Sequence, residues 1–213
     1  MRVVVNAAVS ADGKLSSRER EQIAISDEAD FHRVDELRAE SDAVMVGVGT
    51  VVADDPSLTV DDESLLDGDQ PARVVADSRI RTPADARVLD DRTATYLLVT
   101  ESAPPGFVAE MEERDATVVV AGTDRVDLTA AFDELADDGI EQLMVEGGGE
   151  LIASLFAANL VDELRVYVGP MIIGGRDAPT LADGEGFVED FPELSLERVE
   201  RVGEGVLLCY ERL

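Results

Sequence analysis

The sequence has almost no lysine. Arginine outnumbers it seventeen to one, and Lys14 is the single example. Forty-seven acidic residues against 18 basic ones give a net charge of −29, which argues against nucleic acids and anionic membranes as partners because both bind to positively charged surfaces. Acid spread along the chain suits a salt-rich cytosol, where self-repulsion is screened. We therefore expect a halophilic source; the alternative, an ordinary acidic mesophilic protein, would contain more lysine.

Cysteine and histidine are equally scarce, with one of each. The lone Cys209 cannot form an intrachain disulfide, which favours a reduced, cytoplasmic location. One cysteine and one histidine also exclude a zinc site of the usual nitrogen and sulfur kind. No stretch approaches the roughly 20 apolar residues that cross a bilayer, and the N-terminal apolar run is too short for a convincing signal peptide.

Apolar residues, in contrast, make up 45% of the 213 positions, enough for a substantial core. Short apolar runs alternate with helical patterns, which predicts an α/β fold with a mostly parallel sheet flanked by helices. After residue 160 the alternation stops, and strands at 161–169 and 205–211 predict an antiparallel extension. No linker or repeat interrupts the chain, so we expect a single domain over residues 1–213.

The stretch from Ala43 to Val60 predicts a ligand site. Its first residues are typical of a strand buried on both faces, and glycines follow at positions 47 and 49. Glycines at the carboxyl end of a parallel strand let a ligand approach the backbone. Thr50 is expected to cap a short helix, with Asp54 one turn later. The alternative is a glycine turn followed by an acidic surface loop.

Two further strands end in residues suited to binding phosphate. Ser78 and Arg79 follow the strand at 73–77, a position where arginine accommodates the 2′-phosphate of NADP. Glu146 and the glycines at 147–149 precede a helix, whose bared amides form an anion site. The alternatives are surface arginines paired with acids, and a surface acid beside a tight turn.

One helix and one loop contribute basic candidates. Lys14 follows the first strand, where a compact positive charge suits an anionic substrate; a solvated loop lysine is the alternative. A helix is expected from an N-cap at Ser26 to about residue 39, with Phe31, Val34 and Leu37 toward the core. Arg38 lies near the C-terminal end of this helix and is a second basic candidate for binding an anionic substrate. The alternative is that it only compensates the helix dipole.

Taken in order, these motifs resemble the riboflavin-pathway reductases, over residues 3 to about 175. Bacterial members of that family are fused to a zinc deaminase, whose H-x-E and P-C-x-x-C signature is absent here. The motifs that carry the resemblance are Asp12-Gly13-Lys14, Leu37 to Ala43, Val46 to Thr50, Ala53 to Pro56, Asp77 to Arg79 and Glu146 to Gly149.

The resemblance implies a dihydrofolate-reductase-like fold, a homodimer, and NADPH as hydride donor for converting a ribosylaminopyrimidine phosphate to its ribityl form. Bacterial members usually carry an arginine where this chain has Asp61, so the ligand of the substrate phosphate stays unassigned. The implied NADPH contacts are Ala8, Thr50, Asp54, Ser78, Arg79, Gly147, Gly148 and Gly149. The implied substrate contacts are Lys14, Arg38, Leu58 and Glu146, with catalytic roles for Lys14 and Glu146.

In such a reaction the cofactor supplies the hydride, and the protein orients the two reactants. Our hypothesis is that Glu146 favours the cationic imine form of the substrate while Lys14 and Arg38 hold its anionic or polar end. One rival function is an NADPH reductase of another pyrimidine or a pterin, although the sequence lacks tryptophan for a pterin pocket. The other is a non-catalytic nucleotide-binding module, which would not need these three residues.

Overall fold

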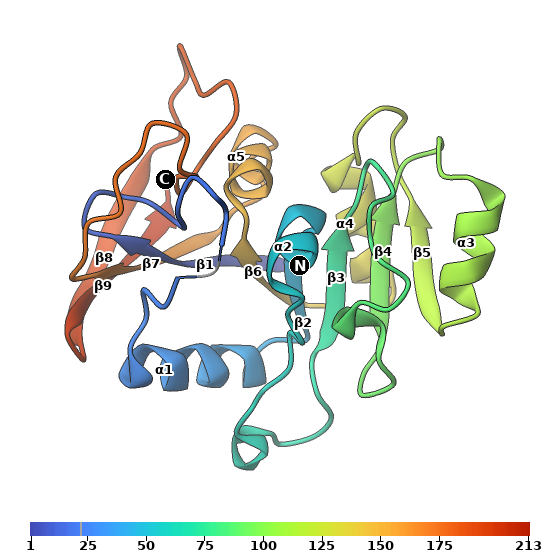
Figure 1. Ribbon diagram of the computed structural model, residues 1–213, viewed down its shortest axis with the longest axis horizontal. Helices are drawn as coiled ribbons and strands as arrows, with labels where there is room; N and C mark the ends of the chain where they lie inside the picture. The colour runs from blue at the N-terminus through green and yellow to red at the C-terminus, as the bar shows by residue number, and fades with distance from the viewer. Residues whose placement is uncertain (22) are drawn as a thin grey trace.

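The structure is a computed structural model that describes residues 1–21 and 23–213. Its strands form one nine-stranded sheet in the order β5-β4-β3-β2-β6-β1-β7-β9-β8 (Figure 1). Among the residues described, no helix is both long and apolar enough to span a membrane. The strands are β1 (Arg2–Ser10), β2 (Ala43–Gly47), β3 (Ala72–Ala76), β4 (Thr95–Val99), β5 (Ala116–Val120), β6 (Gln142–Gly147), β7 (Glu163–Gly169), β8 (Leu194–Val202) and β9 (Gly205–Arg212).

Neighbouring strands from β5 to β7 pair in parallel, and β9 then pairs antiparallel with both β7 and β8. The predicted α/β class, with antiparallel strands at the C-terminus, is therefore confirmed. Strand β8 was not predicted. It lies at the edge of the sheet with mostly exposed residues, and a register shift between Leu196 and Arg198 breaks its alternation, so it lacks a buried strand's pattern.

Helices cover both faces of the sheet; Figure 1 shows α1 and α5 on opposite sides of β1, β6 and β7. Apolar residues of α4 and α5 pack on one face, and those of α2 and α3 on the other, where α1 also packs through Leu37 on Val4 and Met144. The helices are α1 (Glu28–Ala39), α2 (Val48–Asp54), α3 (Pro105–Glu112), α4 (Leu128–Asp137) and α5 (Gly149–Ala157), with short 3-10 helices η1 (Glu63–Leu65) and η2 (Arg87–Leu89).

The N-terminus of α1 differs from the prediction. Asp27, not Ser26, caps the helix by accepting a hydrogen bond from the amide of Asp30 at 3.1 Å. The same carboxylate accepts a 2.7 Å bond from the amide of Glu204 in the turn between β8 and β9. Leu37 is buried as predicted, but Phe31 is 56% exposed, because the residue buried in the first turn of α1 is its neighbour Asp30.

Helix α2 also begins earlier than predicted. Gly47 is its N-cap residue and makes no side-chain capping bond, whereas Thr50 lies inside the helix. The expectation that Thr50 caps this helix is therefore wrong. The glycine at the end of β2 turns the chain directly into the helix, so no hydroxyl cap is needed, and the Thr50 hydroxyl is left beside the amide turn after β6, in contact range of Gly148.

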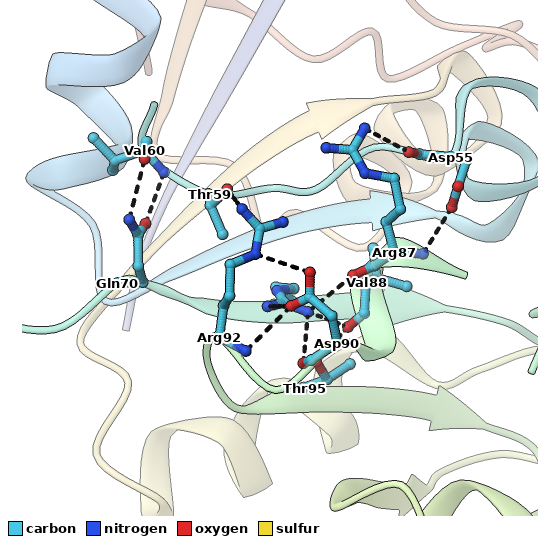
Figure 2. A network of polar contacts seen from close by, with 10 residues as sticks. Asp55, Thr59, Val60, Gln70, Arg87, Val88, Asp90, Arg92 and Thr95 are labelled. Atoms are coloured by element: carbon cyan, nitrogen blue, oxygen red, sulfur yellow. Dashed lines mark hydrogen bonds and ion pairs between the residues drawn. The ribbon is translucent and has the colours of Figure 1, made fainter. Parts of the chain in front are cut away.

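A polar network lies at the amino-terminal ends of β3 and β4, away from the glycine turns (Figure 2). Its centre is Arg73, which is fully buried and donates to the carbonyl of Val88 at 2.6 Å and to the carboxylate of Asp90 at 2.5 Å. Around it, Gln70 bonds the backbone of Val60 in both directions. The network ties residues 59–73 to residues 87–95 and stabilises the base of the sheet.

Candidate functional site

A cleft of about 1060 Å³ lies along the carboxyl ends of the parallel strands. Its walls come from the segments that directly follow β2, β3, β5 and β6, together with Ala8 near the end of β1 and the residues between β1 and α1. This is the edge at which open α/β sheets bind ligands, because helix N-termini and loop amides converge there. The candidate residues that follow β2, β3 and β6 therefore lie in one cleft.

The cleft brings together most of the candidate residues but not all of them. Lys14, Arg38 and Leu58 are absent from its walls. Leu58 is buried in the core beneath α2, so its side chain does not reach the cleft surface. The candidate residues that line the cleft are Ala8, Thr50, Asp54, Ser78, Arg79, Glu146, Gly147, Gly148 and Gly149.

The glycine turn after β6 opens backbone amides to the cleft. Gly148 is the N-cap residue of α5, and Gly147 has a φ of 130°, which side-chain-bearing residues rarely adopt. A Cβ on Gly149 would overlap the carbonyl oxygen of Thr180 and lie 2.9 Å from the Asp183 carboxylate. Glycine is thus required for the close approach of residues 180–183, and the free amides of α5 suit an anionic group.

Glu146 and Arg38 form a two-pronged ion pair across 108 residues of sequence. The Nε of Arg38 donates to Oε1 of Glu146 at 2.6 Å, and its second terminal nitrogen donates to Oε2 at 2.9 Å. The third nitrogen donates to the carbonyl of Thr59 at 2.8 Å. Burial would lower the pKa of Arg38, but the carboxylates of Glu146 and Asp35 outweigh that effect and raise it. Arg38 therefore holds Glu146 in place.

Lys14 lies in a tight corner beside the cleft. Its Nζ donates to the carbonyl of Ala178 at 3.3 Å, and its backbone pairs with Thr180. The corner is fixed by Asp12, whose carboxylate accepts from Ser10 at 2.6 Å and from the amides of residues 173 and 174 at 3.0 and 2.8 Å. Those bonds, the one from Ser10 contributing most, lower the pKa of Asp12 to about 2.

Four arginines gather on the cleft: Arg20, Arg79, Arg81 and Arg125. None of them forms an ion pair within residues 1–21 and 23–213, although the chain carries 47 acids. Because these guanidinium groups have no carboxylate partner, their donors are available to an anion bound in the cleft. Three of the four follow β3 or β5, so positive charge is concentrated at that end.

Hydrogen bonds fix the loops that carry three of these arginines. Asp77 is fully buried at the end of β3, and its Oδ2 accepts from the amides of Arg81 and Thr82, each at 2.7 Å. Ser78 accepts a 2.9 Å bond from the amide of Val126, which joins the loop after β3 to the loop after β5. The two loops thus form one preorganised wall.

Asp54 lies in the same cleft, at the end of α2. Burial raises the pKa of its carboxyl group above the usual range, and no cationic partner among the described residues opposes the effect. A partly desolvated carboxylate without a partner is stabilised by a hydrogen-bond donor such as a hydroxyl group. The sugar hydroxyls of a nucleotide supply such a donor.

Sequence reasoning missed two features of the cleft. Arg125 follows β5 just as Arg79 follows β3, so the rule that ligands bind at strand ends would have found it. Phe31 was assigned to the core because its spacing from Val34 and Leu37 is helical, yet it lies on the cleft. Spacing alone does not say where along a helix the buried face begins.

Comparison with known proteins assigns the family. The family model of the RibD C-terminal domain matches residues 1–208. This chain belongs to the RibD C-terminal domain family. Among curated members of that family, it is 50% identical over 210 residues to a 2,5-diamino-6-ribosylamino-4(3H)-pyrimidinone 5′-phosphate reductase from Archaeoglobus fulgidus, covering 95% of this chain and 94% of the relative. The enzyme of the same name from Methanothermobacter thermautotrophicus is 51% identical, with 98% and 96% covered.

Solved structures of RibD proteins share the fold. Acinetobacter baumannii RibD superimposes with a TM-score of 0.81 at 23% identity, covering all of this chain and 58% of that chain. A pyrimidine reductase-like protein from Corynebacterium diphtheriae gives a TM-score of 0.80 at 18% identity, with 92% of its chain covered. The chain thus spans a little more than half of the Acinetobacter protein and nearly all of the Corynebacterium one.

Proposed function

We propose that this protein reduces the ribosylamino side chain of 2,5-diamino-6-ribosylamino-4(3H)-pyrimidinone 5′-phosphate to the ribitylamino form in riboflavin biosynthesis. The observation that carries this is about 50% identity, over nearly the full length of both chains, to two reductases named for that substrate. The protein is an oxidoreductase of the riboflavin pathway. A reductase of another pyrimidine or a pterin is less well supported, since the two relatives at about 50% identity are named for this pyrimidine phosphate.

The hydride donor in the proposal is NADPH, which supplies a hydride from its nicotinamide ring. The residues present fit such a dinucleotide: the bared amides of α5 suit the pyrophosphate, and Asp54 suits a ribose hydroxyl. Ser78, Arg79, Arg81 and Arg125 suit a 2′-phosphate, because charge-assisted arginine contacts favour phosphate. The small side chain of Ala8 leaves room for a flat ring above β1.

Glu146 is proposed to stabilise positive charge on the imine form of the substrate. Both of its oxygens are held by Arg38, yet each keeps a lone pair for a substrate donor. Arg38 is therefore better described as the residue that positions Glu146 than as the substrate contact expected from the resemblance. Lys14 remains a candidate for the anionic end of the substrate, since its ammonium has only one carbonyl partner among the described residues.

A homodimer, a cytoplasmic location and a single domain over residues 1–213 complete the proposal. The outer hairpin offers a surface for self-association: by register, Leu196, Val199 and Val206 share one face of β8 and β9, and all three are exposed. Light scattering in molar KCl tests this directly. A dimer that dissociates in Val199→Glu supports the hairpin as the interface, and a wild-type monomer contradicts the dimer.

The first experiment follows NADPH absorbance in molar KCl, with and without the pyrimidine substrate. Substrate-dependent oxidation is expected, and it should be lost in Glu146→Ala and weakened at least about tenfold in kcat/KM in Lys14→Met, about 1.4 kcal/mol. Arg79→Ala should raise the KM for NADPH and leave that for NADH unchanged. NADPH binding without turnover would favour a different substrate, and the absence of NADPH binding would contradict the cofactor assignment.

A further inference from the structure

Phe31 is an exposed aromatic side chain on the wall of the cleft. It lies in the first turn of α1 and is 56% exposed. Among the described residues that line the cleft, it is the only aromatic one. Aromatic residues make up just 4% of this chain, and its side chain contributes little to the core. A large apolar surface left open beside a ligand site indicates contact with the ligand.

The backbone beneath Phe31 is held rigidly. The neighbouring Asp30 is fully buried and accepts bonds from the hydroxyl of Ser26 at 2.5 Å and from Nε of Arg33 at 2.8 Å. Asp27 caps the same turn of the helix. The ring is therefore carried on a fixed support, which lowers the entropic cost of using it as a platform.

The position of Phe31 along the sheet indicates which ligand it meets. Phe31 and Arg38 are seven residues apart, which places them on the same face of α1 two turns from each other. Arg38 holds Glu146, and Leu37 packs α1 onto β1 and β6. The unpaired arginines that follow β3 and β5 lie on the far side of β2 in the sheet order.

The cleft therefore has two chemically different ends. The end that follows β3 and β5 carries three arginines and suits phosphate. The other end carries Glu146 and, two turns of α1 away from the Arg38 that holds it, Phe31, together with Leu15, Ile25 and Arg20 from the segment between β1 and α1. A flat heterocycle with amino groups fits the second end, since a carboxylate accepts from amino groups and an aromatic face stacks on the ring. The substrate named for the curated relatives, a diaminopyrimidinone, has this chemistry.

We propose that Phe31 stacks on the pyrimidinone ring of the substrate and sets the enzyme's affinity for it. This inference rests on the proposed function and adds a contact that neither the motifs nor the comparisons assign. Phe31 takes no part in hydride transfer; it holds the ring so that the ribosylamino carbon faces the nicotinamide.

Steady-state kinetics of Phe31→Ala, Phe31→Leu and Phe31→Tyr in molar KCl test the proposal. Phe31→Ala should raise the KM for the pyrimidine about tenfold, as expected for loss of one stacking contact, while the KM for NADPH stays unchanged. Phe31→Leu keeps apolar area without an aromatic face and should show an intermediate loss, and Phe31→Tyr should retain wild-type KM. The melting temperature should change little because the side chain is exposed.

The matched control is Phe191→Ala, since Phe191 is 66% exposed and lies off the cleft. It should leave both KM values at the wild-type level. An unchanged pyrimidine KM in Phe31→Ala, a rise in the KM for NADPH instead, or an altered oligomeric state as the only effect would each overturn the inference. A wild-type enzyme that fails to turn over the pyrimidine would overturn the proposed function itself, which separates the two failures.

Discussion

The ion pair between Arg38 and Glu146 shows how a side chain outside the walls of the cleft can fix one that lines it. With Nε and one terminal nitrogen on the two carboxylate oxygens, Arg38 fixes both the charge and the orientation of Glu146. A lysine at this position carries the charge but offers no planar fork. If Arg38 positions Glu146, as we propose, the geometry of its side chain should matter as well as its charge.

We therefore expect Arg38→Lys to lower kcat/KM for the pyrimidine by about ten- to a hundredfold, corresponding to loss of charge-assisted hydrogen bonds of about 1.5–3 kcal/mol. The KM for NADPH should stay close to wild type, because Arg38 does not line the cleft. Kinetics at saturating NADPH measure the effect, and the melting temperature reports any cost of an imperfectly paired Glu146. Full activity in Arg38→Lys would refute the positioning role.

Asp12 gives a prediction about pH. Its pKa is about 2 in the folded protein against 3.8 ordinarily, because Ser10 and the amides of residues 173 and 174 donate to the carboxylate. A depressed folded-state pKa adds stability that is present above the unfolded pKa and is lost as pH falls toward the folded value. Asp12→Asn should thus melt at a lower temperature than wild type above pH about 4, with the difference disappearing near pH 2. A difference that is constant with pH would contradict this.

At the level of elements, the sequence predicts where the parallel strands end, but not which side chains from other elements pack against those ends. Short apolar runs followed by glycine, serine or arginine indicated where β2, β3 and β6 would deliver side chains, since parallel strands share one carboxyl edge. The pairing of Arg38 with Glu146 was not predictable, because it joins residues 108 positions apart through the packing of α1 on the sheet.

The same limit applies to β8 and to α1. Strand β8 is an exposed edge strand with a register shift, so it carries no continuous buried pattern. Helix α1 has the expected length, but which of its turns faces the core depends on where it crosses β1 and β6. The local sequence predicts the spacing of apolar residues along a helix, while tertiary packing determines which of those residues are buried.

The network around Arg73 gives a prediction for the stability of the sheet. Arg73→Met would remove a buried donor from the carboxylate of Asp90 and the carbonyl of Val88, which would keep only Arg92 and Thr95 respectively. Removing one partner of a buried ion pair costs about 3–5 kcal/mol, and a loss of about 3 kcal/mol is expected here because Asp90 is 35% exposed and keeps Arg92. Denaturant unfolding in molar KCl should show a loss of this size. The KM for NADPH in the remaining folded enzyme should be unchanged, because Arg73 lies at the opposite end of β3 from the cleft.

Arg114→Met is the matched control for that experiment, since Arg114 is a more exposed arginine whose ion pair with Glu110 is 3.6 Å long. Exposed pairs contribute about 0–1 kcal/mol, so its unfolding free energy should stay near wild type. Equal losses in the two variants would show that burial of Arg73 is not what makes its contacts strong.

For the molecule as a whole, the net charge of −29 dominates its response to salt. Self-repulsion reaches over about 30 Å at 0.01 M salt but only about 3 Å at 1 M. We expect the melting temperature and the activity to rise together as KCl increases toward molar concentrations. Sucrose at equal osmolality, which does not screen charge, should not reproduce the full effect. A melting temperature in dilute buffer equal to that in molar KCl would contradict a halophilic origin.

The double engagement of Asp27 links two distant parts of this molecule. One carboxylate oxygen accepts a hydrogen bond from the helix that carries Phe31 and Arg38, and the other accepts one from the turn between the two outermost strands. A Cβ on Gly203 would overlap this carboxylate, so the turn and the helix are in direct mechanical contact. We therefore expect a displacement of the outer hairpin to shift the N-terminal end of α1. If two subunits associate through that hairpin, substrate binding in one subunit would alter substrate binding in the other. Cooperative steady-state kinetics would be the expected result.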